Sequence, residues 1–264
     1  MRDNRIDVLK GVLIIIVVFG HALQLVNGGT GNPLHNYIRS FQMEAFFCVS
    51  GYVYALSLGK GVLGLRAIGN HARRLLVPYV VWVFLYWVVF HIFKHDGFPI
   101  RELGLSFVKS GFWFLRQLFI VILSFDLFFS VKISKLYRVV IPLSILLLTS
   151  VVPGNREILH YATFFLLGFY LNYRNKTCTQ TAMLGQGGVI WLGRNSLGIY
   201  AIHWNVLFCW IHNRIINFHS LVLAGWNIYL VALAVGMAWL LCTICLVIII
   251  KQNSVARVLL LGEK

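Results

Sequence analysis

Long apolar runs separated by short polar loops recur along the whole chain, and they constrain its fold more than any other feature. Of the 264 residues, 59% are hydrophobic and only 12% are charged. A soluble domain has about a quarter of its residues charged, and about 20 apolar residues are enough to cross a bilayer as a helix. The sequence therefore predicts an all-α, polytopic transmembrane helix bundle, with residues 1–264 forming a single integral-membrane domain.

The apolar runs divide into about eight predicted spans. They cover residues 8–26, 37–58, 75–93, 112–131, 139–152, 158–173, 189–211 and 221–250. The last span is long enough to tilt or to break near Gly236, and the turn-rich stretches 27–36 and 172–188 are predicted loops. Most of the 23 Lys and Arg residues fall on the same side as the N-terminus. The positive-inside rule therefore predicts cytoplasmic termini for this multi-pass membrane protein.

The net charge of +15 would suggest a nucleic-acid partner in a soluble protein. Here the basic residues flank apolar runs, so membrane topology explains most of them and no nucleic-acid partner is expected. The first run exceeds a signal-peptide core and lacks a small-residue cleavage site, which predicts a retained span. Cys242 and Cys245 have C-x-x-C spacing within a run of Leu, Ile and Val. We interpret them as small apolar residues and expect no metal site.

The first predicted helix carries a basic residue near its start and a histidine deep inside. Lys10 and His21 are eleven residues apart, which in an α-helix leaves them about 20° apart in azimuth with a rise of roughly 16 Å. Asp7 lies about 40° from His21 on the same face. Such a helix can hold an anionic ligand with its reactive end at His21. The alternative is that His21 hydrogen-bonds a neighbouring carbonyl and has no chemical role.

The pattern Arg5-x-Asp7-x-x-Lys10, followed after ten residues by His21, resembles the first-helix signature of the membrane-bound acyltransferase-3 family. Members of that family are integral-membrane O-acyltransferases that modify bacterial surface polysaccharides. The resemblance implies that His21 is catalytic. The family usually has about ten spans, so eight would make this chain a compact member.

The second predicted span also resembles the family, reading Phe41-Gln-Met-Glu44-Ala-Phe-Phe-Cys-Val-Ser-Gly-Tyr52. The family has His where this chain has Gln42, and Pro where it has Glu44. A carboxylate in a membrane helix needs a partner, and antiparallel helices joined by a short loop would place Glu44 at the depth of His21. Glu44 is therefore a candidate orienting acid for His21. Pairing with Arg39 in the headgroup region is the alternative.

Two adjacent arginines, Arg73 and Arg74, stand at the predicted cytoplasmic start of the third span. The stretch resembles the family's Arg-x-x-Arg followed by Leu-Leu-x-Pro-Tyr, with His71 in the first arginine position and Arg74 in the second. Adjacent arginines can grip phosphate groups through bidentate contacts. Simple positive-inside anchoring is the alternative.

Further polar and aromatic residues lie inside or beside predicted spans. Trp113 belongs to a Trp-Phe-Leu element similar to the family's, and it reads as an interfacial anchor or as a stacking surface for a sugar. Arg116 and Asp126 are about 80° apart on one helix, so we predict that they do not pair.

A third element, Gly193-x-x-Ser196-x-x-Ile199-Tyr200-x-x-His203, also resembles the family. Ser196, Tyr200 and His203 form one polar stripe, which predicts either an acceptor-binding surface or a structural interhelical network.

The resemblance implies an O-acyltransferase of the cell inner membrane, most simply an acetyltransferase, that uses acetyl-CoA as its donor co-substrate. Lys10, Arg73 and Arg74 would hold the donor from the cytoplasm, and His21 would act as general base on a hydroxyl of a cell-surface glycan or a lipid-linked saccharide. Direct transfer and transfer through an acyl-enzyme both remain open. A transporter or flippase for a lipid-linked or anionic solute is the leading alternative, and a non-catalytic membrane scaffold is the third.

Overall fold

The computed structural model describes residues 4–27, 31–58, 65–94, 99–109, 111–130, 135–152, 154–174, 187–203, 222 and 225–263. Within these residues the chain is helical throughout and contains no strand, which confirms the predicted all-α class. The chain divides into two compact units, each described separately below. Unit 1 comprises Met1–Phe46 and Cys178–Asn253, and unit 2 comprises Phe47–Thr177 and Ser254–Lys264.

Among the described residues, three helices are long and apolar enough to cross a membrane. They are Asn4–Val26, Arg66–Ile92 and Ile228–Gln252. The bent pair Ile100–Val108 and Trp113–Phe129 would make a fourth if it forms one span. The membrane-helix character is therefore confirmed, while the number of eight spans and the cytoplasmic termini stay predictions.

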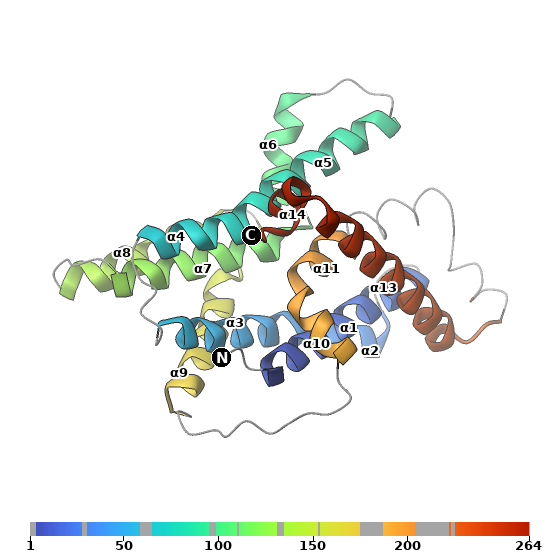
Figure 1. Ribbon diagram of the computed structural model, residues 1–264, viewed down its shortest axis with the longest axis horizontal. Coiled ribbons are helices and arrows are strands. Elements are labelled where there is room, and N and C mark those ends of the chain that lie inside the picture. Colours follow the sequence, from blue (N-terminus) through green and yellow to red (C-terminus); the bar gives the residue numbers. More distant parts are fainter. Residues whose placement is uncertain are drawn as a thin grey trace. The chain divides into compact units, whose positions relative to one another are not determined.

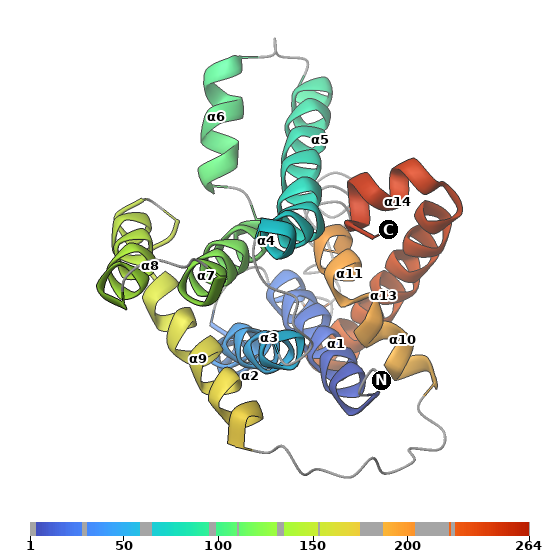
Figure 2. The ribbon, with the colours of Figure 1, turned by 60° about the vertical axis from the view of Figure 1, so that its left-hand side comes forward.

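Unit 1 is organised around its first helix. Its elements are α1 (Asn4–Val26), α2 (Pro33–Arg39), the start of α3 (Gln42–Leu58), α10 (Gly187–Arg194), α11 (Ser196–Ile202) and α13 (Ile228–Gln252). Helix α1 packs against α2, α10, α11 and α13, and Figures 1 and 2 both show α10 and α11 beside it. The unit therefore brings the first two helices of the chain together with α10, α11 and α13, which come more than 140 residues later.

Glycines on both partners let α1 and α10 approach at backbone distance. An ideal Cβ on Gly11 would lie 2.1 Å from the carbonyl oxygen of Val189, and one on Gly193 would lie 1.6 Å from that of Asp7. Small residues permit this kind of close crossing between membrane helices. The pair of glycines therefore fixes α10 against the first half of α1.

Unit 2 contains the remaining helices. They are the rest of α3, α4 (Leu65–His71), the π-helical turn η1 (Ala72–Leu76), α5 (Val77–Lys94), α6 (Ile100–Lys109), α7 (Trp113–Ser130), α8 (Lys135–Ser150), α9 (Ile158–Arg174) and α14 (Ser254–Leu261). Helices α3 and α9 cross closely through Gly51 and Gly168, whose ideal Cβ atoms would lie 1.9 and 1.8 Å from carbonyl oxygens of the opposite helix. A core of buried aromatic side chains, including Phe47, Phe114 and Phe165, fills the unit.

The predicted boundary between the loop 27–36 and the span 37–58 is wrong, because a separate short helix crosses it. Residues from Pro33 to Arg39 form α2, and α3 begins only at Gln42. The side chain of Asn32 caps α2 by accepting hydrogen bonds from the backbone N–H groups of Leu34 and His35 at 2.9 and 3.2 Å. Proline at the first helical position completes a favourable helix start, because its fixed φ suits the helix.

The predicted span 189–211 is also wrong as one continuous helix, because Asn195 interrupts it. Asn195 has φ −103° and ψ 9°, and it separates α10 from α11. Its side-chain amide donates to the carbonyl of Trp191 at 2.7 Å. The predicted span 221–250 begins later within the described residues, at Ile228, and α13 runs unbroken through Gly236. Helix α6 lies in a stretch for which no span was predicted.

Candidate functional site

Two histidines far apart in the sequence lie side by side in unit 1. The ring centroids of His21, on α1, and His203, directly after α11, are 5.3 Å apart with 40° between the ring planes. His203 is fully buried and His21 is half-buried. The structure therefore joins the predicted catalytic histidine to one end of the predicted polar stripe.

The orientation of the His203 ring follows from its backbone contact. Its Nδ1 lies 3.0 Å from the carbonyl oxygen of Ile199. A carbonyl only accepts, so Nδ1 must donate, and in the neutral ring Nε2 is then a proton acceptor. The ring of Tyr200 lies 5.8 Å from that of His203, measured between centroids. Ser196 is buried at the opposite end of α11, about two turns away.

Helix α2, which the sequence analysis did not predict, supplies the charged surroundings of His21. His35 and Arg39 both act on His21 electrostatically, and the side chain of Gln24 hydrogen-bonds with it. Burial, together with the positive charge of Arg39, lowers the pKa of His35. The capping pair Asn32-Pro33 was the sequence signal that could have revealed this helix.

The start of α3 packs close to His21. An ideal Cβ on Gly20 would lie 3.0 Å from Cγ2 of Ile38 and 3.4 Å from Oε1 of Gln42. Gln42, which departs from the family pattern, is therefore buried next to the residue that precedes His21. Glu44 is half-buried in the first turn of α3. Its role as the orienting acid of His21 stays a prediction.

Lys10 and Asp7 lie on the first half of α1. The helix is unbroken between Lys10 and His21, so the shared face that the spacing predicted applies to this structure. Asp7 is almost fully buried, and its Oδ2 lies 3.2 Å from Nε of Arg194 on α10. Arg194 also donates to the side chain of Asn4 at 3.1 Å. Asp7 thus links α1 to α10, a connection that sequence spacing did not reveal.

In unit 2, Arg73 and Arg74 lie in the π-helical turn η1. Turns of this kind are rare and frequently occur at functional sites. Arg73 is half-buried and Arg74 is exposed. The turn therefore presents two cations close together, as the predicted phosphate-binding role requires.

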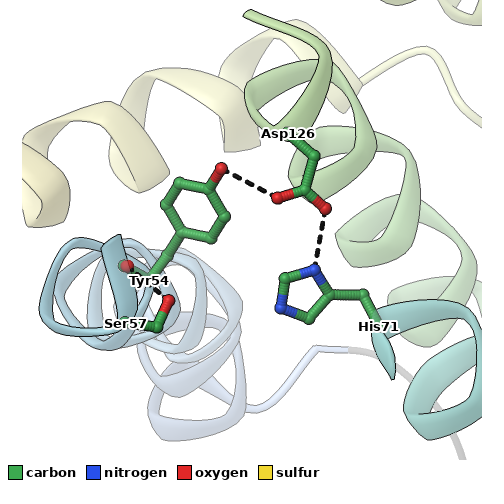
Figure 3. A network of polar contacts seen from close by, with 4 residues as sticks. All are labelled: Tyr54, Ser57, His71 and Asp126. Carbon is green, nitrogen blue, oxygen red and sulfur yellow. Dashed lines mark hydrogen bonds and ion pairs between the residues drawn. The ribbon is translucent and has the colours of Figure 1, made fainter. Parts of the chain in front are cut away.

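A buried carboxylate stands next to this turn. Figure 3 shows Asp126, on α7, between Tyr54 and His71. The phenol of Tyr54 donates to Oδ1 at 2.9 Å, and Nδ1 of His71 lies 2.8 Å from Oδ2. A buried carboxylate needs such partners because its desolvation is costly. Since His71 directly precedes η1, this network ties the turn to α7 and α3.

The prediction that Arg116 and Asp126 do not pair with one another agrees with these contacts. Arg116 donates instead to the side chain of Asn155 at 3.2 Å and to the carbonyl of Val108 at 3.0 Å. The ring of Trp113 stacks on Tyr161, with centroids 5.4 Å apart and planes at 27°. One face of Trp113 is therefore already covered by protein.

The predicted site residues divide between the two units. Lys10, His21, Glu44, Ser196, Tyr200 and His203 belong to unit 1, whereas Arg73, Arg74 and Trp113 belong to unit 2. In the part of the chain that the structure describes, no three His, Cys, Asp or Glu side chains gather as a metal site would require.

Comparison with known proteins finds a family described as an acyltransferase domain, which matches residues 3–190. The nodulation protein NolL of Sinorhizobium fredii is 30% identical over 177 residues, which cover 64% of this chain and 48% of that protein. NolL of Mesorhizobium japonicum is 32% identical over 127 residues, covering 45% of this chain and 34% of that protein. The matched region is thus less than half the length of either relative. No solved structure matches the chain.

Proposed function

The chain belongs to the acyltransferase-3 family of integral-membrane acyltransferases, and on that premise we propose that it is an O-acetyltransferase of the cell inner membrane. It transfers an acetyl group from acetyl-CoA to a hydroxyl of a cell-surface glycan or a lipid-linked saccharide. The observation that carries the proposal is the pair formed by His21 and His203. His21 lies on the same helix as Lys10.

In the proposed reaction, His21 is the general base. It takes the proton of the acceptor hydroxyl while the hydroxyl oxygen attacks the thioester carbonyl. The carbon–sulfur bond then breaks, and the coenzyme A thiolate leaves and receives the proton. A neutral His203 can accept a hydrogen bond from the imidazolium that forms at His21, because its Nδ1 proton is already committed to Ile199. Glu44 orients His21 in this scheme.

The donor is held by its phosphate groups. Lys10 offers a cation on the face of α1 that also carries His21, and Arg73 and Arg74 offer two guanidinium groups in the η1 turn. Guanidinium groups bind phosphate through paired hydrogen bonds, whereas an ammonium acts as a point charge. The reaction uses no metal ion.

The acceptor is bound by polar groups of α11 and by aromatic surface. Ser196 and Tyr200 lie on the same helix that ends at His203, so a saccharide hydroxyl held by them would be delivered to the histidine pair. Trp113 is a second candidate contact, through the edge or face that Tyr161 does not cover.

The test is release of free thiol from acetyl-CoA by the purified full chain in detergent, with and without simple methyl glycosides as acceptors. We expect His21→Ala to lower turnover by about 10² to 10⁴, the usual contribution of a general base. His160→Ala is the matched control, because His160 is an exposed histidine on α9. Turnover that survives His21→Ala would refute the assignment. A transporter or a scaffold would show no thioester turnover in the parent chain either.

A further inference from the structure

Two arginines of unit 2 share an unusual feature. The side-chain Nε atoms of Arg73, on η1, and Arg257, on α14, are buried and have no hydrogen-bond partner in the described part of the chain. A guanidinium is always charged and has five N–H donors, so a buried donor without an acceptor is costly. Both atoms are therefore prepared to donate to an acceptor that binds there.

Helix α14 is held directly against the η1 turn. The indole N–H of Trp82, on α5, donates to the carbonyl of Leu260 at 2.8 Å. Gly262 follows α14 with φ +65°, and an ideal Cβ there would lie 2.4 Å from the carbonyl oxygen of Arg74. Only glycine suits both this backbone conformation and this close approach. Figures 1 and 2 both show α14 beside the start of α5.

Arg257 therefore stands on a helix that packs against the turn carrying Arg73 and Arg74. Arg257 precedes Gly262 by five residues, a rise of about 7.5 Å along a helix. Residues 65–77, which include η1, contain no Asp or Glu, and the described residues 254–263 contain only Glu263. The backbone N–H of Glu263 donates to the carbonyl of Arg257 at 3.4 Å. The two stretches hold four arginines, Arg66, Arg73, Arg74 and Arg257. Glu263 and the adjacent Asp126 supply two carboxylates, so the region has an excess of positive charge.

We propose that Arg257 joins Arg73 and Arg74 in one binding site for a phosphate-bearing ligand, namely the pyrophosphate and ribose phosphate of a nucleotide-type donor. The inference rests on the proposed function, which assigns the donor's phosphates to Arg73 and Arg74. It adds α14, which follows α13 in the chain and packs against the arginine turn. Nε and a terminal nitrogen of each guanidinium form the fork that matches two phosphate oxygens.

The experiment measures binding of coenzyme A and of inorganic pyrophosphate to the purified full chain in detergent by titration calorimetry. We expect Arg257→Gln to weaken both ligands by about tenfold or more, as loss of a charge-assisted hydrogen-bond pair would. Arg257→Lys keeps the charge but not the forked pair of donors, so its affinities should lie between those of the parent and those of Arg257→Gln. Arg101→Gln removes an exposed arginine from α6 and should leave both affinities unchanged.

Thermal unfolding of each variant separates binding from folding, because α14 packs on α5 and η1. If Arg257→Gln has a lower melting temperature than the parent, the binding affinities of Arg257→Lys, which keeps the charge, test the role of Arg257 instead. The inference is overturned if Arg74→Gln loses coenzyme A while Arg257→Gln binds both probes as the parent does. That result leaves the proposed function standing. If the parent chain instead releases no thiol from acetyl-CoA, the proposed function fails, while Arg257-dependent pyrophosphate binding would still support an anion site.

Discussion

Replacing Gly193 by alanine tests the crossing of α1 and α10 on which the geometry of the histidine pair depends. The new Cβ would lie 1.6 Å from the carbonyl oxygen of Asp7 and 2.6 Å from its carbonyl carbon. Ordinary van der Waals contact begins at 3.4 Å, so the helices must separate by roughly 1.8 Å at this point. The obstacle is backbone on both sides, and no side chain can rotate away.

The expected cost lies at the upper end of what overpacking a well-packed interior costs, about 3 kcal/mol. For a chain of this size, that corresponds to a fall of about 6–12 °C in the melting temperature. The assay is thermal unfolding of the purified chain in detergent, followed by circular dichroism. Thiol release from acetyl-CoA should fall as well, because α10 leads through Asn195 into the helix that ends at His203.

Gly188→Ala is the matched control in the same helix. No atom lies within 4 Å of its ideal Cβ, so alanine meets open space there. Alanine is also the better helix former, by up to about 1 kcal/mol. Its melting temperature should therefore equal or slightly exceed that of the parent. Equal melting temperatures for Gly193→Ala and Gly188→Ala would show that α1 and α10 do not approach at backbone distance, and the reasoning would be wrong.

Three further predictions concern buried charge. Asp126→Asn should cost about 1–3 kcal/mol in thermal unfolding, because it removes the charge that Tyr54 and His71 share; an unchanged melting temperature would contradict the network. Arg194→Met should destabilise the chain by a similar amount, since it takes a cation from the buried Asp7; Arg156→Met, at an exposed site, is its control. The pKa of His35 is lower in the folded chain than its ordinary value of 6.5, so as the pH falls His35 takes up its proton at a higher pH in the unfolded chain than in the folded one. Stability should therefore drop from pH 7.5 to 5.5, and His35→Gln should reduce that drop.

The apolar pattern predicted helices well where hydropathy and helix ends coincide. The prediction 158–173 differs from α9 by one residue, and the first span ends at Val26 as α1 does. It failed where a helix ends without a change of hydropathy. Asn195 divides one apolar stretch into α10 and α11, and the turn-rich composition of residues 27–36 concealed α2. Capping residues carried the missing information in the second case.

The sequence predicted single residues of the candidate site, but it did not predict which of them lie next to one another. Resemblance to a family pointed to His21 and to His203 separately, and nothing in either motif indicates that their rings meet. The ion pair between Asp7 and Arg194 joins residues 187 positions apart, and local periodicity contains no information at that range. The π-helical form of η1 was not predicted either, because hydropathy does not distinguish it from an ordinary helical turn.

The position of His21 follows from contacts along the whole of α1. Gly11 and Asp7 fix its first half against α10, and Gly20 lets Ile38 and Gln42 approach one residue before the histidine. On α13, an ideal Cβ of Gly236 would lie 3.5 Å from Cβ of Ala22, one residue after it. Close contacts therefore hold the helix on both sides of His21. A general base needs this kind of fixed placement, because effective proton transfer depends on hydrogen-bond reach before it depends on pKa. The small residues of α1 and its partners are thus part of the proposed catalytic device, although none of them carries a reactive group.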